Sequence, residues 1–295
     1  MARVDAWVSD RMAAELTRQL DALRKAGADV LLVDLMGNGG GTEWADAAVR
    51  MVTGVQLKAE KVGFVRGPQW ATSLGEKERD LRAAADRETG LDRERLLQLA
   101  DQADVLRREA ETPCDSTPMW HGKRPDCQWL GGGVYSTGPL DSMPEWAKGK
   151  SWAPLVFQPA KFKYRAGVWT GPLIVLVDQG SASASEGFAA QLQDSRAAVI
   201  VGAPTLGAGC GHTDGSAPTI LKHSGATFEM PDCARFRADG SNEILSIQPD
   251  ILVGLRSQDG PHRRAGLIAE KLPDAVEQAV RQRTPAASGI AIAPH

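Results

Sequence analysis

The stretch from Gly180 to Phe188, Gly-Ser-Ala-Ser-Ala-Ser-Glu-Gly-Phe, contains the residue types best suited to chemistry. It lies between an apolar run at 172–178 and a segment at 188–192 whose apolar residues recur at helical spacing. In a turn between a strand and a helix, the first backbone N–H groups of the helix lack acceptors and can receive negative charge from a reacting group. A serine in this turn could therefore act as a nucleophile. Small residues before a helix are also ordinary capping residues, so the turn alone leaves a purely structural role open.

The elements that would position this turn form an α/β pattern. An amphipathic helix is predicted over 12–26, with Gly27 as its stop, followed by a short strand at 30–35. A glycine cluster, residues 37–41, then precedes a second helix at 43–52. Strand, glycine loop and helix outline an α/β unit. The loop lacks both the P-loop ending and the GxGxxG spacing of nucleotide sites, but its glycines would let a backbone N–H approach a reacting carbonyl oxygen, as an oxyanion hole requires.

The remaining elements are predicted from periodicity and composition. We expect a strand pair at 55–65, a helical hairpin over 73–111 broken near Gly90, and a long Cys- and Trp-containing loop at 113–152. Strand-like patterning resumes at 157–169, and a further strand at 197–201 gives βαβ spacing with the strand at 173–178. A hairpin at 220–230, a late strand or turn at 247–253, a helix over 267–280 and a loose tail from residue 284 complete the chain.

Composition excludes several classes of function. The 295 residues carry a net charge of -3, and Lys and Arg are spread along the chain, which argues against nucleic-acid binding. No apolar run approaches the ~20 residues needed to cross a bilayer, so we expect no transmembrane segment. Without a metal-binding or nucleotide-binding spacing we expect no cofactor. The sequence gives no indication of oligomeric state.

The four cysteines fall into two local pairs. Cys114 and Cys127 bracket one polar loop, and Cys210 and Cys233 bracket another segment, which is typical of disulfides in an oxidising compartment. Zinc binding is the competing interpretation, but the chain has no CxxC motif and its histidines lack ligand spacing. We therefore predict a periplasmic or secreted protein. Since no signal peptide is visible, we expect the export signal to lie upstream of this chain.

Four stretches resemble, in order, the carboxyl-terminal processing (tail-specific) serine protease family, which is related to tricorn protease and interphotoreceptor retinoid-binding protein repeats. They are Val33-Asp34-Leu35-Met36-Gly37-Asn38-Gly39-Gly40-Gly41, the segment 177–186, Val201-Gly202-Ala203-Pro204-Thr205-Leu206-Gly207 and Ile247-Gln248-Pro249-Asp250. The resemblance implies an α/β fold with a ClpP/crotonase-like core. No PDZ module is visible. We expect the first part of the core at 1–55, an insertion at 56–165 that could act as a lid, the second part at 166–283 and the loose tail at 284–295.

By position, the resemblance places the family's nucleophile at Ser183. The implied oxyanion hole is the N–H of Ala184 together with a glycine N–H from Gly40 or Gly41. The family's general base is a lysine 25 residues after the nucleophile, and this chain has Ala208 there. That is its main departure from the family.

Three explanations of the missing lysine stay open. His212 could act as the base, oriented by an acid such as Glu243 or Asp214, as in the serine, histidine and glutamate of tricorn enzymes. A segment upstream of this chain could supply the base. Alternatively, the protein is a non-catalytic relative, or Ala208 is itself an inactivating replacement.

The leading hypothesis is a serine-type peptidase, an endopeptidase acting on exposed or unstructured polypeptide. The main alternative is an inactive relative that binds a peptide or another ligand in a cleft lined by Trp129 or Trp146. A third class, an enoyl-CoA-handling enzyme of the crotonase-like fold, would leave the serine motif unexplained.

Overall fold

A four-stranded parallel sheet carries the serine turn, the stretch that begins at Gly180 and leads into the helix at Ala184. In the computed structural model, which describes residues 2–115, 117–124, 127–211, 219–256 and 258–283, the order of its strands is β1-β4-β5-β9. Their bounds are Leu31–Asp34 (β1), Leu173–Val177 (β4), Val199–Gly202 (β5) and Ile251–Leu252 (β9). All residues of β4 and β5 are buried, as expected for strands covered on both faces.

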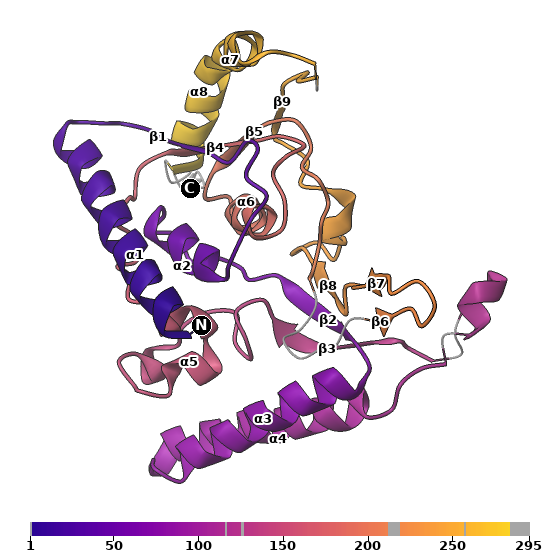
Figure 1. Cartoon of the computed structure of the whole chain (residues 1–295). Helices are drawn as coiled ribbons and strands as arrows, with labels where there is room; N and C mark the ends of the chain where they lie inside the picture. Colours follow the sequence, from indigo (N-terminus) through magenta and orange to yellow (C-terminus); the bar gives the residue numbers. More distant parts are fainter. Residues whose placement is uncertain (1, 116, 125–126, 212–218, 257, 284–295) are drawn as a thin grey trace, which may run out of the picture.

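Helices cover both faces of this sheet (Figure 1). Val175 and Val177 of β4 face α1, α2 and α6, whereas Ile174 and Leu176 face α7 and α8. These helices span Ala2–Lys25 (α1), Trp44–Met51 (α2), Ala184–Asp194 (α6), Pro261–Ala269 (α7) and Leu272–Arg283 (α8). The alternation of side chains along β4 thus fixes two cores, and the predicted α/β fold class is confirmed. None of the helices in the described part of the chain is long and apolar enough to cross a membrane.

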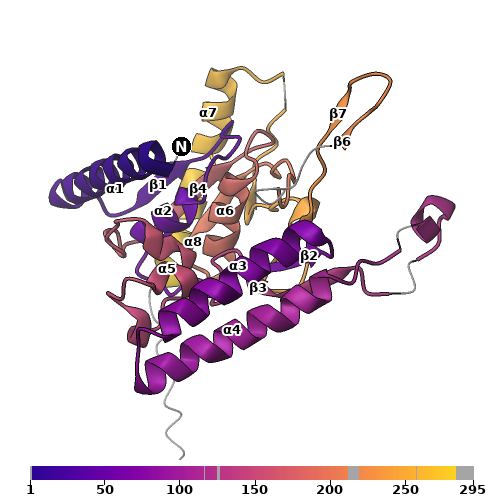
Figure 2. The same cartoon turned by 60° about the horizontal axis from the view of Figure 1, so that its bottom comes forward.

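A second sheet and a helical hairpin lie beside the parallel sheet (Figure 2). This antiparallel sheet has the order β3-β2-β8 and joins residues far apart in the sequence. Its strands span Leu130–Tyr135 (β3), Lys61–Val65 (β2) and Cys233–Phe236 (β8), and the hairpin helices span Pro68–Ala85 (α3) and Gly90–Ala110 (α4). The predicted helical hairpin with its break near Gly90 is therefore confirmed.

Short elements complete the described chain. A two-stranded ribbon pairs β6 with β7, as the predicted hairpin required. The bounds are Thr219–Ile220 (β6), Thr227–Phe228 (β7), Ala153–Val156 (α5), Thr117–His121 (η1), Glu145–Ala147 (η2), Gln158–Lys161 (η3) and Glu243–Leu245 (η4).

Four expectations about secondary structure are wrong. The loop expected at 113–152 contains a strand, β3, which pairs with β2. Residues 55–65 supply one strand, β2, whose partners β3 and β8 come from elsewhere in the chain. Residues 157–169 form η3 and irregular backbone, because Phe157 is buried against the α3–α4 hairpin and Trp152 instead of in a sheet. The predicted helix over 267–280 is two helices, since Pro273 has no N–H to donate to the carbonyl oxygen four residues earlier, that of Ala269, which is the last residue of α7.

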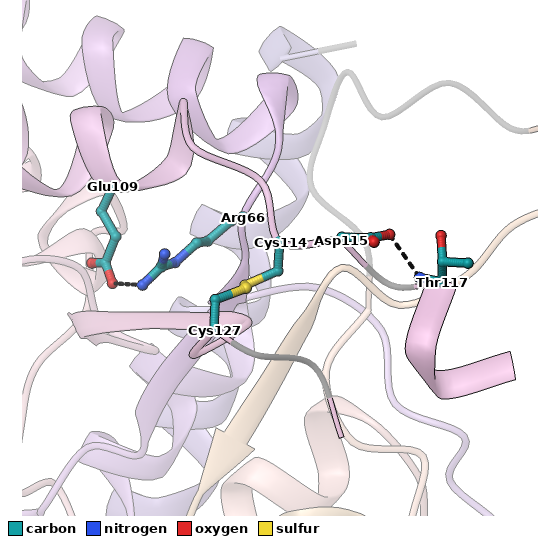
Figure 3. The surroundings of a disulfide bond; sticks show 6 residues. All are labelled: Arg66, Glu109, Cys114, Asp115, Thr117 and Cys127. Atoms are coloured by element: carbon teal, nitrogen blue, oxygen red, sulfur yellow. Dashed lines mark hydrogen bonds and ion pairs between the residues drawn. A yellow bond between two sulfur atoms is a disulfide. The ribbon is translucent and has the colours of Figure 1, made fainter. Parts of the chain in front are cut away.

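Both predicted cysteine pairs form disulfide bonds. Cys114 and Cys127 close the loop after α4, with Cα atoms 6.0 Å apart, close to the ion pair of Arg66 and Glu109 (Figure 3). Cys210 and Cys233 join the segment after β5 to the start of β8, with Cα atoms 5.5 Å apart. The second bond ties residues next to the serine turn's cleft to the antiparallel sheet.

Candidate active site

Ser183 stands at the N-terminal end of α6 with backbone angles that few non-glycine residues adopt. Its φ is 54° and its ψ is -118°. Its two neighbouring serines, Ser181 and Ser185, are buried, whereas Ser183 is partly exposed and lines a cleft. Strained residues of this kind gather at functional sites, where the surrounding structure holds them. The geometry thus supports Ser183 as the predicted nucleophile.

The serine turn is fastened to the glycine loop that follows β1. Asp178 Oδ1 accepts hydrogen bonds from the backbone N–H groups of Gly37 at 2.8 Å and Gly180 at 2.9 Å. The Ser181 hydroxyl donates to the carbonyl oxygen of Leu35 at 2.7 Å, so Ser181 is occupied by a structural role. The two loops follow neighbouring parallel strands, β1 and β4, and the pairing of these strands brings them together.

Gly40 makes the closest approach to the serine turn. Its φ is +90°, and a Cβ at this position would lie 2.5 Å from the carbonyl oxygen of Ala182 and 2.7 Å from the backbone nitrogen of Ala184. Any side chain there would clash with backbone atoms, so the site requires glycine.

The predicted oxyanion-hole donors differ in their availability. The N–H of Gly40 donates to Asn38 Oδ1 at 3.0 Å, so it is already engaged. The N–H groups of Gly41 and Ala184 have no acceptor among the residues that the structure describes. Of the two predicted glycines, Gly41 is therefore the one whose N–H could donate, with the N–H of Ala184, to a developing oxyanion.

Glu186 is a residue whose role the sequence analysis missed. Its carboxylate is fully buried and accepts hydrogen bonds from Ser183 N–H at 2.8 Å, Ala208 N–H at 2.9 Å, Gly207 N–H at 2.7 Å and the Thr205 hydroxyl at 2.6 Å. It therefore holds the serine turn and the 205–208 segment together. The signal was present, since a serine followed three residues later by glutamate at a helix start is a capping-box pattern.

The segment with the missing lysine lies next to the serine turn. Ala208 is exposed, and its N–H shares Glu186 Oε2 with the N–H of Ser183. His212 and Asp214, the predicted base and one predicted acid, lie outside the described residues. Gly211, the residue before His212, lines the same cleft as Ser183.

Glu243, the other predicted acid, is 1% exposed. Its closest charged partner is Arg235, whose Nη1 atom lies 3.6 Å from Glu243 Oε2, and neither carboxylate oxygen has a hydrogen-bond donor in the described chain. Burial raises the pKa of Glu243 to about 7, against the opposing effect of the Arg235 charge. A buried carboxyl with unused acceptors can orient an imidazole.

The cleft in front of Ser183 has a volume of about 1500 Å³. Its walls come from the loop before α2, from β2 and β3, from α3 and α4, and from residues 228–235. Trp70 on α3 lines it, and the expectation that Trp129 or Trp146 would do so is wrong. Trp146 instead packs against Trp152, with ring centroids 5.5 Å apart. Glu60, just before β2, also lines the cleft and was not singled out in the sequence, because a lone acid there gives no recognisable signal.

Fold and site together define an α/β protein with a serine-bearing turn between a buried parallel strand and a helix. Residues 2–253 match the model of the family described as Peptidase family S41, so the chain belongs to this family. The predicted relation to carboxyl-terminal processing proteases is thereby confirmed.

The chain is similar to several solved structures, and those with a TM-score above 0.5 support the same fold. The chain is similar to mature CPAF, with 16% sequence identity and a TM-score of 0.57, over 91% of this chain and 47% of that one. CPAF in complex with lactacystin gives 17% identity and the same TM-score, with the same coverage. The photosystem II D1 C-terminal processing protease matches at 17% identity and a TM-score of 0.39, over 83% of this chain and 41% of that one. The chain thus spans about half the length of the solved chains it matches.

Proposed function

We propose that this chain forms the catalytic part of a serine endopeptidase acting on exposed or unstructured polypeptide, with Ser183 as nucleophile. The observation that carries the proposal is the strained Ser183, which lines the cleft together with Ala184 and Gly41, whose N–H groups have no acceptor among the described residues. Membership of a peptidase family supports the reaction type. The large open cleft suits an extended chain segment better than a small molecule.

In the proposed reaction the Ser183 hydroxyl oxygen attacks the carbonyl carbon of the scissile peptide bond as its proton passes to a base. The N–H groups of Ala184 and Gly41 stabilise the negative charge on the tetrahedral oxygen. The amine then leaves with a proton, and water hydrolyses the acyl-enzyme. Glu186 is a positioning residue in this scheme, because it orients the turn without contacting the reacting atoms.

His212 is the base that we propose, with Glu243 as the acid that orients it. The Cys210–Cys233 disulfide supports this choice, since it holds the segment leading to His212 beside β8, which also carries Arg235, the partner of Glu243. Asp214 is the alternative acid. An imidazole that titrates near neutrality can take the serine proton without the family lysine.

A fluorophosphonate probe, which reacts with activated serines, tests the assignment. We expect labelling of the wild type and its loss in Ser183→Ala, while Ser185→Ala, a change at the neighbouring buried serine, keeps it. His212→Ala should lower labelling about 100-fold, the scale typical of a lost base. His223→Ala, at an exposed position, is the control. Labelling that is unaffected by Ser183→Ala would disprove the nucleophile.

Ala208 favours one other candidate function. A methyl group cannot accept a proton, so a relative that binds polypeptide without cleaving it is the alternative. Saturable peptide binding with no product and no probe labelling would establish it.

The two disulfides support an oxidising environment outside the cytoplasm. We propose a periplasmic or secreted location on this basis. Cell fractionation of the native host tests it directly.

A further inference from the structure

Beneath one wall of the cleft lie buried hydrogen-bond acceptors that have no donor among the described residues. Glu60 is 2% exposed, and neither of its carboxylate oxygens has a hydrogen-bond partner in the described parts of the chain. The same holds for the amide oxygen of Gln191 and the hydroxyl of Ser136. All three residues line the cleft that contains Ser183. Buried polar groups are normally satisfied, so this group of atoms indicates a missing donor-rich partner.

These acceptors lie close together and close to the nucleophile. Gly187 follows Ser183 by one helical turn, about 6 Å along the axis of α6. A Cβ at Gly187 would be 3.2 Å from Glu60 Oε2. Gln191 is one turn further and donates from Nε2 to the Gly187 carbonyl oxygen at 3.2 Å. The N–H of Ser136 donates to the backbone carbonyl oxygen of Glu60 at 2.9 Å.

The charged groups around Glu60 have other partners, and Arg235 also lies near Glu60: a Cβ at Gly187 would be 3.2 Å from Glu60 Oε2 and 3.4 Å from Arg235 Nη1. Arg235 faces Glu243, with 3.6 Å between Nη1 and Oε2, and Arg237 is paired with Asp194. Asp46 accepts a hydrogen bond from Gln191 Nε2 at 2.8 Å. Glu60 has no ion pair among the described residues. A buried, unpaired carboxylate is costly, and burial raises the pKa of Glu60 to about 8, with the Glu243 charge adding to the effect.

We propose that Glu60, Gln191 and Ser136 form a substrate subsite that binds the cationic side chain of an arginine or lysine in the polypeptide. Guanidinium carries five N–H donors and no acceptor, and ammonium carries three donors, so each supplies what the acceptors lack. A cation also pairs the Glu60 carboxylate, with a charge-assisted hydrogen bond. The inference depends on the proposed function, in which a polypeptide occupies this cleft.

Binding to the Ser183→Ala variant tests the subsite without turnover. The probes are fluorescent ten-residue peptides of Gly, Ala and Ser in which one arginine is moved along the chain. Each has a partner with citrulline, the neutral analogue of arginine, at the same position. Fluorescence anisotropy gives Kd for each pair. We expect the best arginine peptide to bind about tenfold more tightly than its citrulline partner, as expected for a hydrogen-bonded charge pair.

Adding Glu60→Gln should abolish this preference. Adding Glu76→Gln should leave it intact, because Glu76 lines the same cleft but is exposed and lies near Arg79. If Glu60→Gln does not fold, Ser136→Ala replaces it and should reduce the preference about threefold, the effect of losing one neutral hydrogen bond. Equal binding of each arginine and citrulline pair, absence of binding, or a preference that survives Glu60→Gln would overturn the subsite.

These outcomes are independent of catalysis. Fluorophosphonate labelling of Ser183 decides whether the chain is a serine hydrolase, and peptide binding to Ser183→Ala decides whether the subsite takes a cation. A protein that prefers arginine but resists labelling would keep the subsite and lose the proposed peptidase activity.

Discussion

The backbone N–H of Ala208 donates a 2.9 Å hydrogen bond to Glu186 Oε2, the oxygen that also accepts the N–H of Ser183. The position where the family resemblance implies a lysine is therefore held next to the nucleophile, although its side chain is only a methyl group. The backbone therefore places position 208 beside the proposed nucleophile, and the lysine that the resemblance implies there is missing.

Ala208→Lys is expected to increase hydrolysis. Ala208 is exposed, so a longer side chain has room there, and a lysine amine can accept the Ser183 proton once it is neutral. We expect kcat/KM for an unstructured fluorogenic peptide to rise about tenfold or more at pH 9, with a smaller gain at pH 7. Ala208→Met, which has a similar length and no amine, is the control. An equal gain in both variants would show that the effect is not proton transfer.

Glu186→Gln is expected to disrupt both stability and reactivity. An amide has one acceptor oxygen, so at least two of the four donors that now meet the carboxylate lose their partner. The free energy of unfolding should fall by about 2–4 kcal/mol in urea titration, because the lost bonds are buried and charge-assisted. Probe labelling of Ser183 should fall in conditions where the variant is still folded.

Glu88→Gln is the matched control for that change. Glu88 also accepts hydrogen bonds, from Trp152 Nε1 at 2.8 Å and Lys150 Nζ at 3.1 Å, but it does not line the cleft. It should alter stability and leave labelling unchanged. Labelling that is equal in folded Glu186→Gln and wild type would show that Glu186 does not position the nucleophile.

Local patterns predicted the elements around the serine turn. Apolar runs gave β4 and β5, and helical periodicity gave the α3–α4 hairpin, because these signals depend on near neighbours in the sequence. The failures depend on distant partners. Phe157 looked strand-like, yet its burial against the hairpin determines its backbone.

The site shows the same division. The family resemblance, carried over by position, indicated Ser183, Ala184 and the glycine loop. It could not indicate Glu60, whose place in the cleft arises from the pairing of β2 with β3 and β8. The choice between Gly40 and Gly41 also needed coordinates, because it depends on the hydrogen bond of Gly40 to Asn38.

Two buried carboxyls, Glu60 in the cleft and Glu243 on η4, should make the protein less stable as pH rises. Burial raises the pKa of Glu60 to about 8 and that of Glu243 to about 7, from an ordinary value of 4.5. At pH values between the ordinary pKa of 4.5 and the raised pKa values, the folded state binds more protons than the unfolded state. The free energy of unfolding therefore decreases from about pH 5 to pH 8. The charged groups facing Glu60 are Asp46 on α2, Glu243 on η4, Arg235 on β8, and Arg237, the residue that follows β8.

Replacing both acids with glutamine removes this contribution. Urea unfolding of Glu60→Gln/Glu243→Gln should show a smaller loss of stability between pH 5 and pH 8 than wild type, with a gain of about 1–3 kcal/mol at pH 8. At pH 4, where both acids are mostly protonated in either state, the variant should have no such advantage. Glu76→Gln, at an exposed acid of the same cleft, should keep the wild-type pH dependence. If the double variant loses as much stability as wild type over this range, the two carboxyls are ionised in the folded protein and an unobserved partner must stabilise them.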